Sequence, residues 1–263
     1  MSTASPPSPS DRDPEIVARR ASSFGGHAAA YAAERPGYPD EAVRWALEPV
    51  VGRGSLRVLD LAAGTGKLTE ALVPYATTLV AVEPDPGMLA ELRTRLPDVR
   101  AVTGTAERIP LADGSVDAVL VGQALHWFDL DRALPEMARV LSPGGVLACL
   151  WNVDDHRVPW VRGLKQVSRS SLSLRDWQAE RAFTPTPEFP AVEYAEFAHV
   201  QRRTAESMAA TIGTHSHVLI LPEDERAALM ARILDYLHTT PETASGEFDL
   251  PIATVAIRSV LAG

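Results

Sequence analysis

The chain has 263 residues, of which 46% are hydrophobic and 22% charged, and its formal net charge is −9. This length suits one large α/β domain with a substantial buried core, and a second full domain is not expected. The negative charge argues against nucleic acid and anionic membrane as partners, because both require clustered lysine and arginine to neutralise phosphate. We therefore expect a small-molecule substrate, and a monomer or homodimer.

The N-terminal stretch MSTASPPSPSDRDPE lacks the basic and apolar regions of a secretory signal, and no apolar run of the sequence reaches the length of a membrane span. The single cysteine, Cys149, excludes an internal disulfide and is expected to be a small buried hydrophobic residue. The sequence therefore predicts a cytoplasmic protein. Residues 1–20, rich in serine and proline, are predicted to be a disordered tail before one domain over 21–263.

The predicted domain begins with helices and continues as alternating strands and helices. The sequence HAAAYAAERPGYPDEAVRWALEPV predicts two helices separated by a turn at Pro36 and Gly37. From Arg57, short apolar runs alternate with helical segments, which is typical of βαβ units and a parallel sheet. Strands are predicted at 57–62, 77–84, 99–104, 116–125 and 144–152, and helices at 67–73, 86–96 and 131–141.

The regular pattern ends after Trp151, which divides the predicted domain into a core over 55–152 and a C-terminal region over 153–263. Residues 156–190 show no clear period and are predicted to form a lid or insertion at the substrate site. A strand at 191–204, a helix at 222–238 and a last strand at 248–260 would complete the sheet. The pattern predicts a doubly wound α/β fold with seven strands and helices on both faces.

The segment RVLDLAAGTGKLTEAL, residues 57–72, resembles three kinds of nucleotide-binding loop. A P-loop requires glycine and a hydroxyl residue where this chain has Leu61 and Leu68, so that interpretation fails on spacing. A dinucleotide loop fits Gly64 and Gly66 after a strand and Glu83 at the end of the next. Its third glycine is replaced by Thr69, which weakens this interpretation without excluding it.

Four segments, the first of which lies within this loop, occur in order: VLDLAAGTG, VAVEPDPGML, GTAERIPLADGSVDAVLVGQALHWF and EMARVLSPGGVLACLWN. Together they resemble the class I S-adenosylmethionine-dependent methyltransferases, specifically the small-molecule group called type 11. The resemblance is strong over residues 24–152 and loose over the C-terminal third. It implies a Rossmann-like, mostly parallel sheet with an antiparallel last strand. It also implies methyl transfer from S-adenosylmethionine to oxygen, carbon or nitrogen of a small molecule, with secondary metabolism as the expected setting and S-adenosylhomocysteine as the product.

The strand ends supply the residues predicted to hold this cofactor. The loop from Asp60 to Gly66 offers close backbone approach to the amino-acid moiety, and Glu83 can accept hydrogen bonds from both ribose hydroxyls. By resemblance, 105–107 flanks the adenine, Met88 packs on the ring, 123–124 lies under the methionyl part, and the segment of Tyr31 and Arg35 folds over the cofactor. The predicted set is Tyr31, Arg35, Asp60, Ala62, Gly64, Thr65, Gly66, Glu83, Pro84, Met88, Thr105, Ala106, Glu107, Gln123 and Ala124.

The predicted reaction is an in-line displacement that needs positioning and a base only for a protonated acceptor. His126 follows the fourth strand and is the candidate general base, although a wall of the cofactor pocket is an open alternative, as for Trp127 and Phe128. No metal is expected, because His215 and His217 have no identifiable third ligand.

Two other classes of function stay open at this point. One is a cofactor-binding regulator or cyclase of the same fold without methyl transfer, because a loop sequence reports binding and not turnover. The other is an NAD-dependent oxidoreductase, which the missing third glycine and the absence of a YxxxK pair count against.

Overall fold

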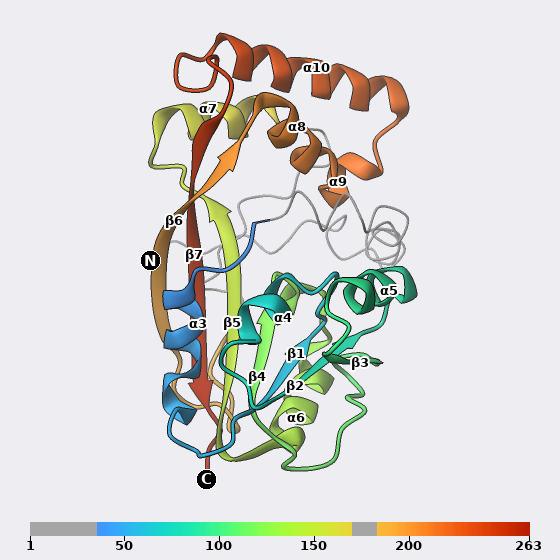
Figure 1. Ribbon diagram of the computed structural model, residues 1–263, viewed down its shortest axis with the longest axis vertical. Coiled ribbons are helices and arrows are strands. Elements are labelled where there is room, and N and C mark those ends of the chain that lie inside the picture. The colour runs from blue at the N-terminus through green and yellow to red at the C-terminus, as the bar shows by residue number, and fades with distance from the viewer. Residues whose placement is uncertain (1–35, 170–182) are drawn as a thin grey trace.

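The computed structural model describes residues 36–169 and 183–263, which fold around one seven-stranded sheet of order β3-β2-β1-β4-β5-β7-β6 (Figure 1). Strands β1 to β5 pair in parallel, and β7 runs antiparallel to both of its neighbours. This topology confirms the predicted fold class. The strands are β1 (Arg57–Leu61), β2 (Thr78–Glu83), β3 (Arg100–Thr103), β4 (Val116–Gly122), β5 (Leu141–Asp154), β6 (Glu193–Arg203) and β7 (Phe248–Val260).

The helices divide between two regions, which we call the body and the cap. The body consists of the parallel sheet with α3 (Asp40–Leu47), α4 (Lys67–Leu72), α5 (Pro86–Arg95) and α6 (Leu130–Val140). The cap consists of α7 (Pro159–Val167), α8 (Ala205–Gly213), α9 (Ser216–Leu219) and α10 (Glu223–Thr239). Figure 1 shows the cap at one end of the molecule, carried by β5, β6 and β7, which extend beyond the other strands.

Both faces of the parallel sheet are covered, because the central strands are apolar on both sides. Val119 of β4 packs with α6 on one face, whereas Leu120 packs with α3 and α4 on the other. Such continuous apolar runs are the sequence pattern of buried parallel strands. The predicted buried state of Cys149 is confirmed, since only 1% of the residue is exposed.

The cap has an apolar core of its own, built on one end of β7. Side chains of α7, α8 and α10 pack against Phe248, Leu250 and Ile252 of that strand. Trp160 of α7 packs edge-to-face on Phe248, with the ring centroids 5.5 Å apart. The apolar packing of α7, α8 and α10 therefore joins the cap to the sheet through β7.

Two sequence predictions require correction. The helix α7 lies in a stretch for which no helix was predicted: its buried residues Trp160, Val161 and Leu164 have helical spacing, but they are a short part of the otherwise irregular run 156–190. Strand β5 begins at Leu141, before the predicted residue 144, because Leu141 already pairs with Val116; a register shift then separates this pair from the next, Ala118 with Val146. Further helices, α8 and α9, occupy residues after β6 that the sequence left unassigned.

Several sequence predictions concern residues that the structure does not describe. The predicted tail over 1–20 and the first predicted helix lie outside the described residues, as do Tyr31 and Arg35. Within 36–169 and 183–263, no helix combines the length and apolar character needed to cross a membrane.

Candidate active site

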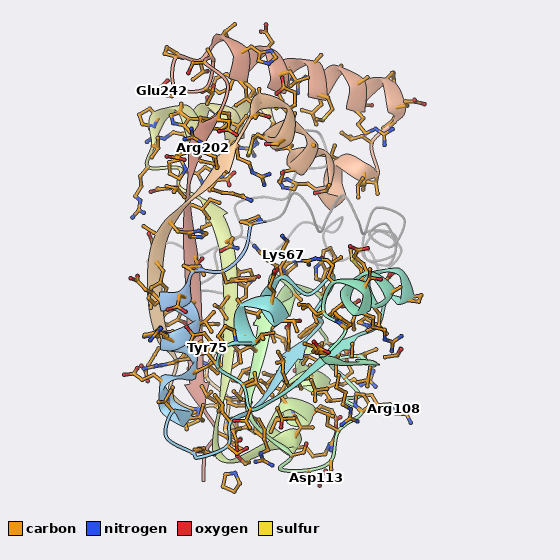
Figure 2. The ribbon with its side chains drawn as sticks, in the orientation of Figure 1. Lys67, Tyr75, Arg108, Asp113, Arg202 and Glu242 are labelled. Carbon is orange, nitrogen blue, oxygen red and sulfur yellow. The ribbon has the colours of Figure 1, made fainter. Side chains whose placement is uncertain are left out.

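The carboxyl ends of β1, β2, β3 and β4 meet at the edge of the body that faces the cap. Figure 2 places Lys67, directly after the β1 loop, at this edge and Asp113 at the opposite end of the body. The four segments that follow these strands enclose a cavity of about 290 Å³, called the cofactor cavity below. Ligands of open α/β sheets bind at this edge. The predicted residues that line it are Ala62, Gly64, Glu83, Pro84, Met88, Thr105, Ala106, Glu107, Gln123 and Ala124.

The loop after β1 adopts a conformation that few residues tolerate. Ala62, Gly64 and Gly66 all have positive φ, at 58°, 58° and 88°. For Ala62 this conformation is strained, and such strain is concentrated at functional sites. Gly66 does not line the cofactor cavity; a Cβ there would lie 3.1 Å from the side chains of Leu92 and Leu96. Because Gly66 has no side chain, α4 can pack close to α5, and this packing supports the loop.

Glu83, at the end of β2, holds the loop from the other side. Its Oε2 accepts a hydrogen bond from the Gly64 N–H at 2.8 Å, and its Oε1 accepts one from the Asp85 N–H at 2.9 Å. The residue is 6% exposed, and burial raises its pKa above the usual range, against these two backbone bonds. Each carboxylate oxygen retains a second lone pair for a hydroxyl donor on a ligand.

Asp60 and Thr65 form a buried polar pocket behind the loop. Asp60 is fully buried; its Oδ2 accepts a hydrogen bond from the Thr69 hydroxyl, while its Oδ1 has no partner among residues 36–169 and 183–263. The Thr65 hydroxyl, 1% exposed, also has no partner in this part of the chain. Both residues line a smaller cavity of about 60 Å³ that shares Gly64 and Gln123 with the cofactor cavity. Burial raises the pKa of Asp60 to about 7.

The unpaired Asp60 oxygen suits a cationic donor. Orphaned buried polar atoms are rare in proteins and call for an explanation such as a missing ligand. An ammonium group would supply a charge-assisted hydrogen bond and favour the ionised carboxylate. Thr69, at the position of the missing third glycine, is therefore explained: it is fully buried and its hydroxyl fixes the Asp60 side chain.

The segment after β4 forms another wall. Gln123 has a φ of 60°, so its backbone is strained as at Ala62. Trp127 and Phe128 line the cofactor cavity, as the wall interpretation predicted. His126 does not line it; its ring packs on Trp127 with the centroids 4.8 Å apart. Although the residue keeps exposed surface, surrounding protein lowers its pKa to about 4 by desolvation, so the imidazole is neutral near pH 7.

A further cavity of about 240 Å³, called the acceptor-side cavity, lies between the strand ends and the cap. Gln123 lines this cavity, the cofactor cavity and the small pocket of Asp60 and Thr65. Pro36 and Asn152 line both this cavity and the small pocket. Most of its lining comes from the ends of β5, β6 and β7 and from α8. Its lining is Pro36, Gln123, Asn152, Val153, Asp154, His156, Gln201, Arg203, Met208, Thr211, His215, Leu250 and Ile252.

The outcome for the sequence-predicted residues is therefore uneven. Thr105 begins no helix, the alternative that the sequence TAER suggested, but a short turn closed by a bridge to Arg108. Asp60 and Thr65 line the small pocket rather than the main cavity. Sequence reasoning missed Asn152, although its position at the end of the fifth strand was the available signal. It also missed Gln201 and Met208, which no local pattern marks.

Known proteins of similar sequence decide the family. A family model described as a methyltransferase domain matches residues 59–149. An uncharacterized methyltransferase of Mycobacterium tuberculosis is 44% identical over 91% of this chain and 96% of its own length. The chain belongs to the class I S-adenosylmethionine-dependent methyltransferases. The resemblance inferred from the sequence is thus confirmed for the family and for methyltransferase activity.

Other methyltransferases support the same assignment. An uncharacterized methyltransferase-like protein of Schizosaccharomyces pombe is 32% identical over 83% of this chain and 87% of its own length. A solved structure from Anaeromyxobacter dehalogenans, provisionally described as a type II methyltransferase, is 29% identical. It covers 87% of this chain and 97% of its own, with a TM-score of 0.62. The match therefore extends across the cap and is not confined to the parallel sheet.

Proposed function

We propose that this methyltransferase transfers a methyl group from S-adenosylmethionine to a small molecule bound between the body and the cap. The observation that carries the proposal is the contiguity of two cavities at the carboxyl ends of the strands. Gln123 lines both of them, so a ligand in one lies beside a ligand in the other. When bound, the cofactor supplies an activated methyl group on a sulfonium.

The residues of the cofactor cavity fit the parts of this cofactor. Glu83 can accept hydrogen bonds from the ribose hydroxyls through its remaining lone pairs, and Met88 offers an apolar surface to the adenine. The unpaired Asp60 oxygen suits the ammonium of the methionyl part. Thr105, Ala106 and Glu107 line the part of the cavity that these assignments leave for the adenine.

Catalysis in this arrangement depends on positioning. The chain's own residues hold two ligands in adjacent cavities, and alignment of reacting atoms supplies much of the rate of a displacement. The role of His126 as general base stays a prediction: its neutral ring can accept a proton, but a pKa of about 4 makes it a weak base. The cytoplasmic location, the absence of nucleic-acid partners and the monomeric or dimeric state also remain predictions.

The same site bears on one alternative, a protein that binds S-adenosylmethionine without transferring its methyl group. A regulator that binds S-adenosylmethionine alone would need no second ligand space beside Gln123, whereas a cyclase of the same fold would. The acceptor-side cavity of about 240 Å³ favours a transferase over such a binding module. The domain assignment follows as a proposal: a core over 55–152 that binds the cofactor, and residues 153–263 that select the acceptor.

Calorimetric titration with S-adenosylmethionine, S-adenosylhomocysteine and NAD tests the proposal. We expect micromolar binding of the first two and none of NAD. Binding of NAD alone, or binding of no ligand by a folded protein, would contradict it. Adding acceptor candidates together with radiolabelled S-adenosylmethionine then tests transfer itself.

A further inference from the structure

The acceptor-side cavity combines an aliphatic floor with polar flanks. Leu250 and Ile252 of the central strand β7 lie in its floor, and the pairing register places Gln201 of β6 opposite Leu250 and Asp154 of β5 opposite Ile252. Neighbouring strands lie about 5 Å apart, so the two polar flanks are separated by roughly 10 Å across the floor. Met208 of α8 adds a further apolar surface. This arrangement suits a small molecule with an apolar body and polar groups at its ends.

Gln123 presents an amide oxygen whose orientation is determined by its surroundings. Its Nε2 donates a hydrogen bond to the backbone oxygen of Asn152 at 3.0 Å. A carbonyl oxygen only accepts, so the nitrogen of the Gln123 amide must face it and Oε1 must face the other way. The backbone is held as well, because the Gln123 N–H donates to the Leu150 oxygen at 2.9 Å. The described residues supply no donor to Oε1, at the junction of the cavities.

Asn152 cannot satisfy that oxygen, because its own side chain is fully engaged. Its Nδ2 donates to the Gly37 oxygen at 2.9 Å, and its Oδ1 accepts the hydroxyl of the buried Thr254. Asn152 therefore serves as a fixed support for Gln123. Among the described residues, none donates to the side-chain oxygen of Gln123, which leaves this oxygen for a ligand.

Gln201 offers a second amide on the far flank of the same cavity. Its Oε1 is buried and has no hydrogen-bond partner in the described part of the chain. A buried amide oxygen without a partner destabilises the empty protein, and a ligand that donates a hydrogen bond to it removes that cost. Gln123 and Gln201 thus mark two hydrogen-bonding points for one ligand, one beside the cofactor cavity and one distant from it.

We infer that the methyl acceptor is a small molecule whose nucleophile is a hydroxyl or amine, and that Gln123 positions this group through its side-chain oxygen. The inference rests on the proposed function. The O–H or N–H donates to Gln123 Oε1, which turns the nucleophile's lone pair toward the cofactor cavity. An ionised carboxylate has no proton to donate, and its oxygens would be repelled by the amide oxygen. A carboxylate is therefore not the group expected beside Gln123.

The methyl transfer forms one bond and breaks another. The lone pair of the acceptor oxygen, or of an amine nitrogen in its unprotonated form, forms the new bond to the methyl carbon. The electron pair of the broken carbon–sulfur bond stays on sulfur, which becomes the thioether of S-adenosylhomocysteine. The proton displaced from the acceptor passes to water, so Gln123 orients the group and is not itself protonated.

The test uses binding to the full-length protein saturated with S-adenosylhomocysteine. A fragment set containing alcohols, amines and carboxylic acids on shared hydrocarbon skeletons is screened by ligand-observed NMR. The variants are Gln123→Met and Gln201→Met, which keep side-chain length but remove the amide. Gln166→Met, on the exposed face of α7, is the matched control. Titration of each variant with S-adenosylhomocysteine comes first; Gln201→Met should bind it as the wild type does, because Gln201 lines neither cofactor-side cavity.

We expect alcohols and amines to bind in preference to the matching acids. Their affinity should fall about fivefold in Gln123→Met and in Gln201→Met, the effect of one hydrogen bond, and be unchanged in Gln166→Met. Preferential binding of acids, or fragments whose binding is insensitive to both substitutions, would overturn the inference, as would a screen in which no fragment binds. If S-adenosylhomocysteine itself fails to bind the wild type, the proposed function fails instead.

Discussion

The body and the cap meet at one pair of adjoining cavities but are built in different ways. In the body, the site consists of loop backbone in special conformations, and Glu83 is fixed by backbone N–H groups of Gly64 and Asp85. On the cap side, the cavity is lined by side chains that project from paired strands, such as Gln201 and Ile252. The cofactor cavity is thus lined by short local segments, whereas the acceptor-side cavity is lined by strands far apart in sequence.

This difference predicts that the two regions can be damaged separately, and Gly163 in the cap gives the largest expected effect. A Cβ at this position of α7 would overlap the hydroxyl of Tyr236, which donates to the Trp160 oxygen at 2.8 Å. Overpacking and loss of that hydrogen bond, offset by the helix-propensity gain of alanine over glycine, should make Gly163→Ala destabilising by about 3 kcal/mol. Urea unfolding measures the change, and calorimetry on the folded variant should find S-adenosylhomocysteine affinity within twofold of wild type.

Gly213→Ala is the matched control for Gly163→Ala. A Cβ at the end of α8 would meet only Met230, at an ordinary 3.8 Å, so this variant should be as stable as the wild type or more stable. A similar loss of stability in both variants would show that alanine is poorly tolerated anywhere in the cap helices. Loss of cofactor binding in folded Gly163→Ala would show that the body and the cap are not separable.

Asp60 provides the next largest effect, in the body. Its folded pKa of about 7 lies above the usual value of a carboxyl, so its contribution to stability is full at low pH and is lost as pH rises toward 7. Asp60→Asn keeps the neutral form at every pH. We expect the empty variant to exceed the wild type in unfolding free energy at pH 8 by on the order of 3 kcal/mol, and to match it below pH 4. Thermal unfolding over this pH range measures it; a constant difference at all pH values would contradict the shifted pKa.

Glu83→Ala tests the cofactor assignment directly. Removal of the carboxylate should weaken S-adenosylhomocysteine binding by about 2 kcal/mol, or roughly thirtyfold, because hydrogen bonds to a charged group are lost. Calorimetry measures the dissociation constant. Glu225→Ala, exposed on α10 of the cap, is the control and should leave it unchanged. An unaltered constant in Glu83→Ala would remove the ribose role.

His126→Ala has the smallest expected effect. A general base with a pKa of about 4 provides little driving force near pH 7, so we expect turnover to fall about tenfold while cofactor affinity stays within twofold. Steady-state kinetics with an identified acceptor, together with calorimetry, separates the two. Equal losses in turnover and affinity would make His126 a support for Trp127 and not a base.

The sequence predicted the body well because its information is local. Strands β1, β2 and β3 occur where apolar runs predicted them, and Glu83 and Gly64 could be placed from the rule that ligands bind at strand ends, whereas Gln123 was placed by the family resemblance. The physical reason is that Glu83 and Gly64 lie at, or within three residues of, the end of their own buried strands. The confirmed family assignment rests on the same segments.

The cap could not be predicted to the same depth. Gln201 lies in a weakly alternating strand, and only its pairing with β7 brings it opposite Leu250 and into the cavity. Likewise, Asn152 supports Gln123 because β5 and β7 extend together past the parallel sheet, where Thr254 fixes its side chain. Such contacts depend on register between distant strands, which no local period encodes.

The measurement that most directly tests the division between the two regions is amide hydrogen exchange with and without S-adenosylhomocysteine. The account predicts increased protection in the segments that follow β1, β2, β3 and β4, around residues 62–66, 84–88, 104–107 and 123–128. Exchange in α7 and α10 should be unchanged, because the cofactor cavity has no lining from these helices. Protection confined to the cap, with no change at the four strand ends, would contradict the account.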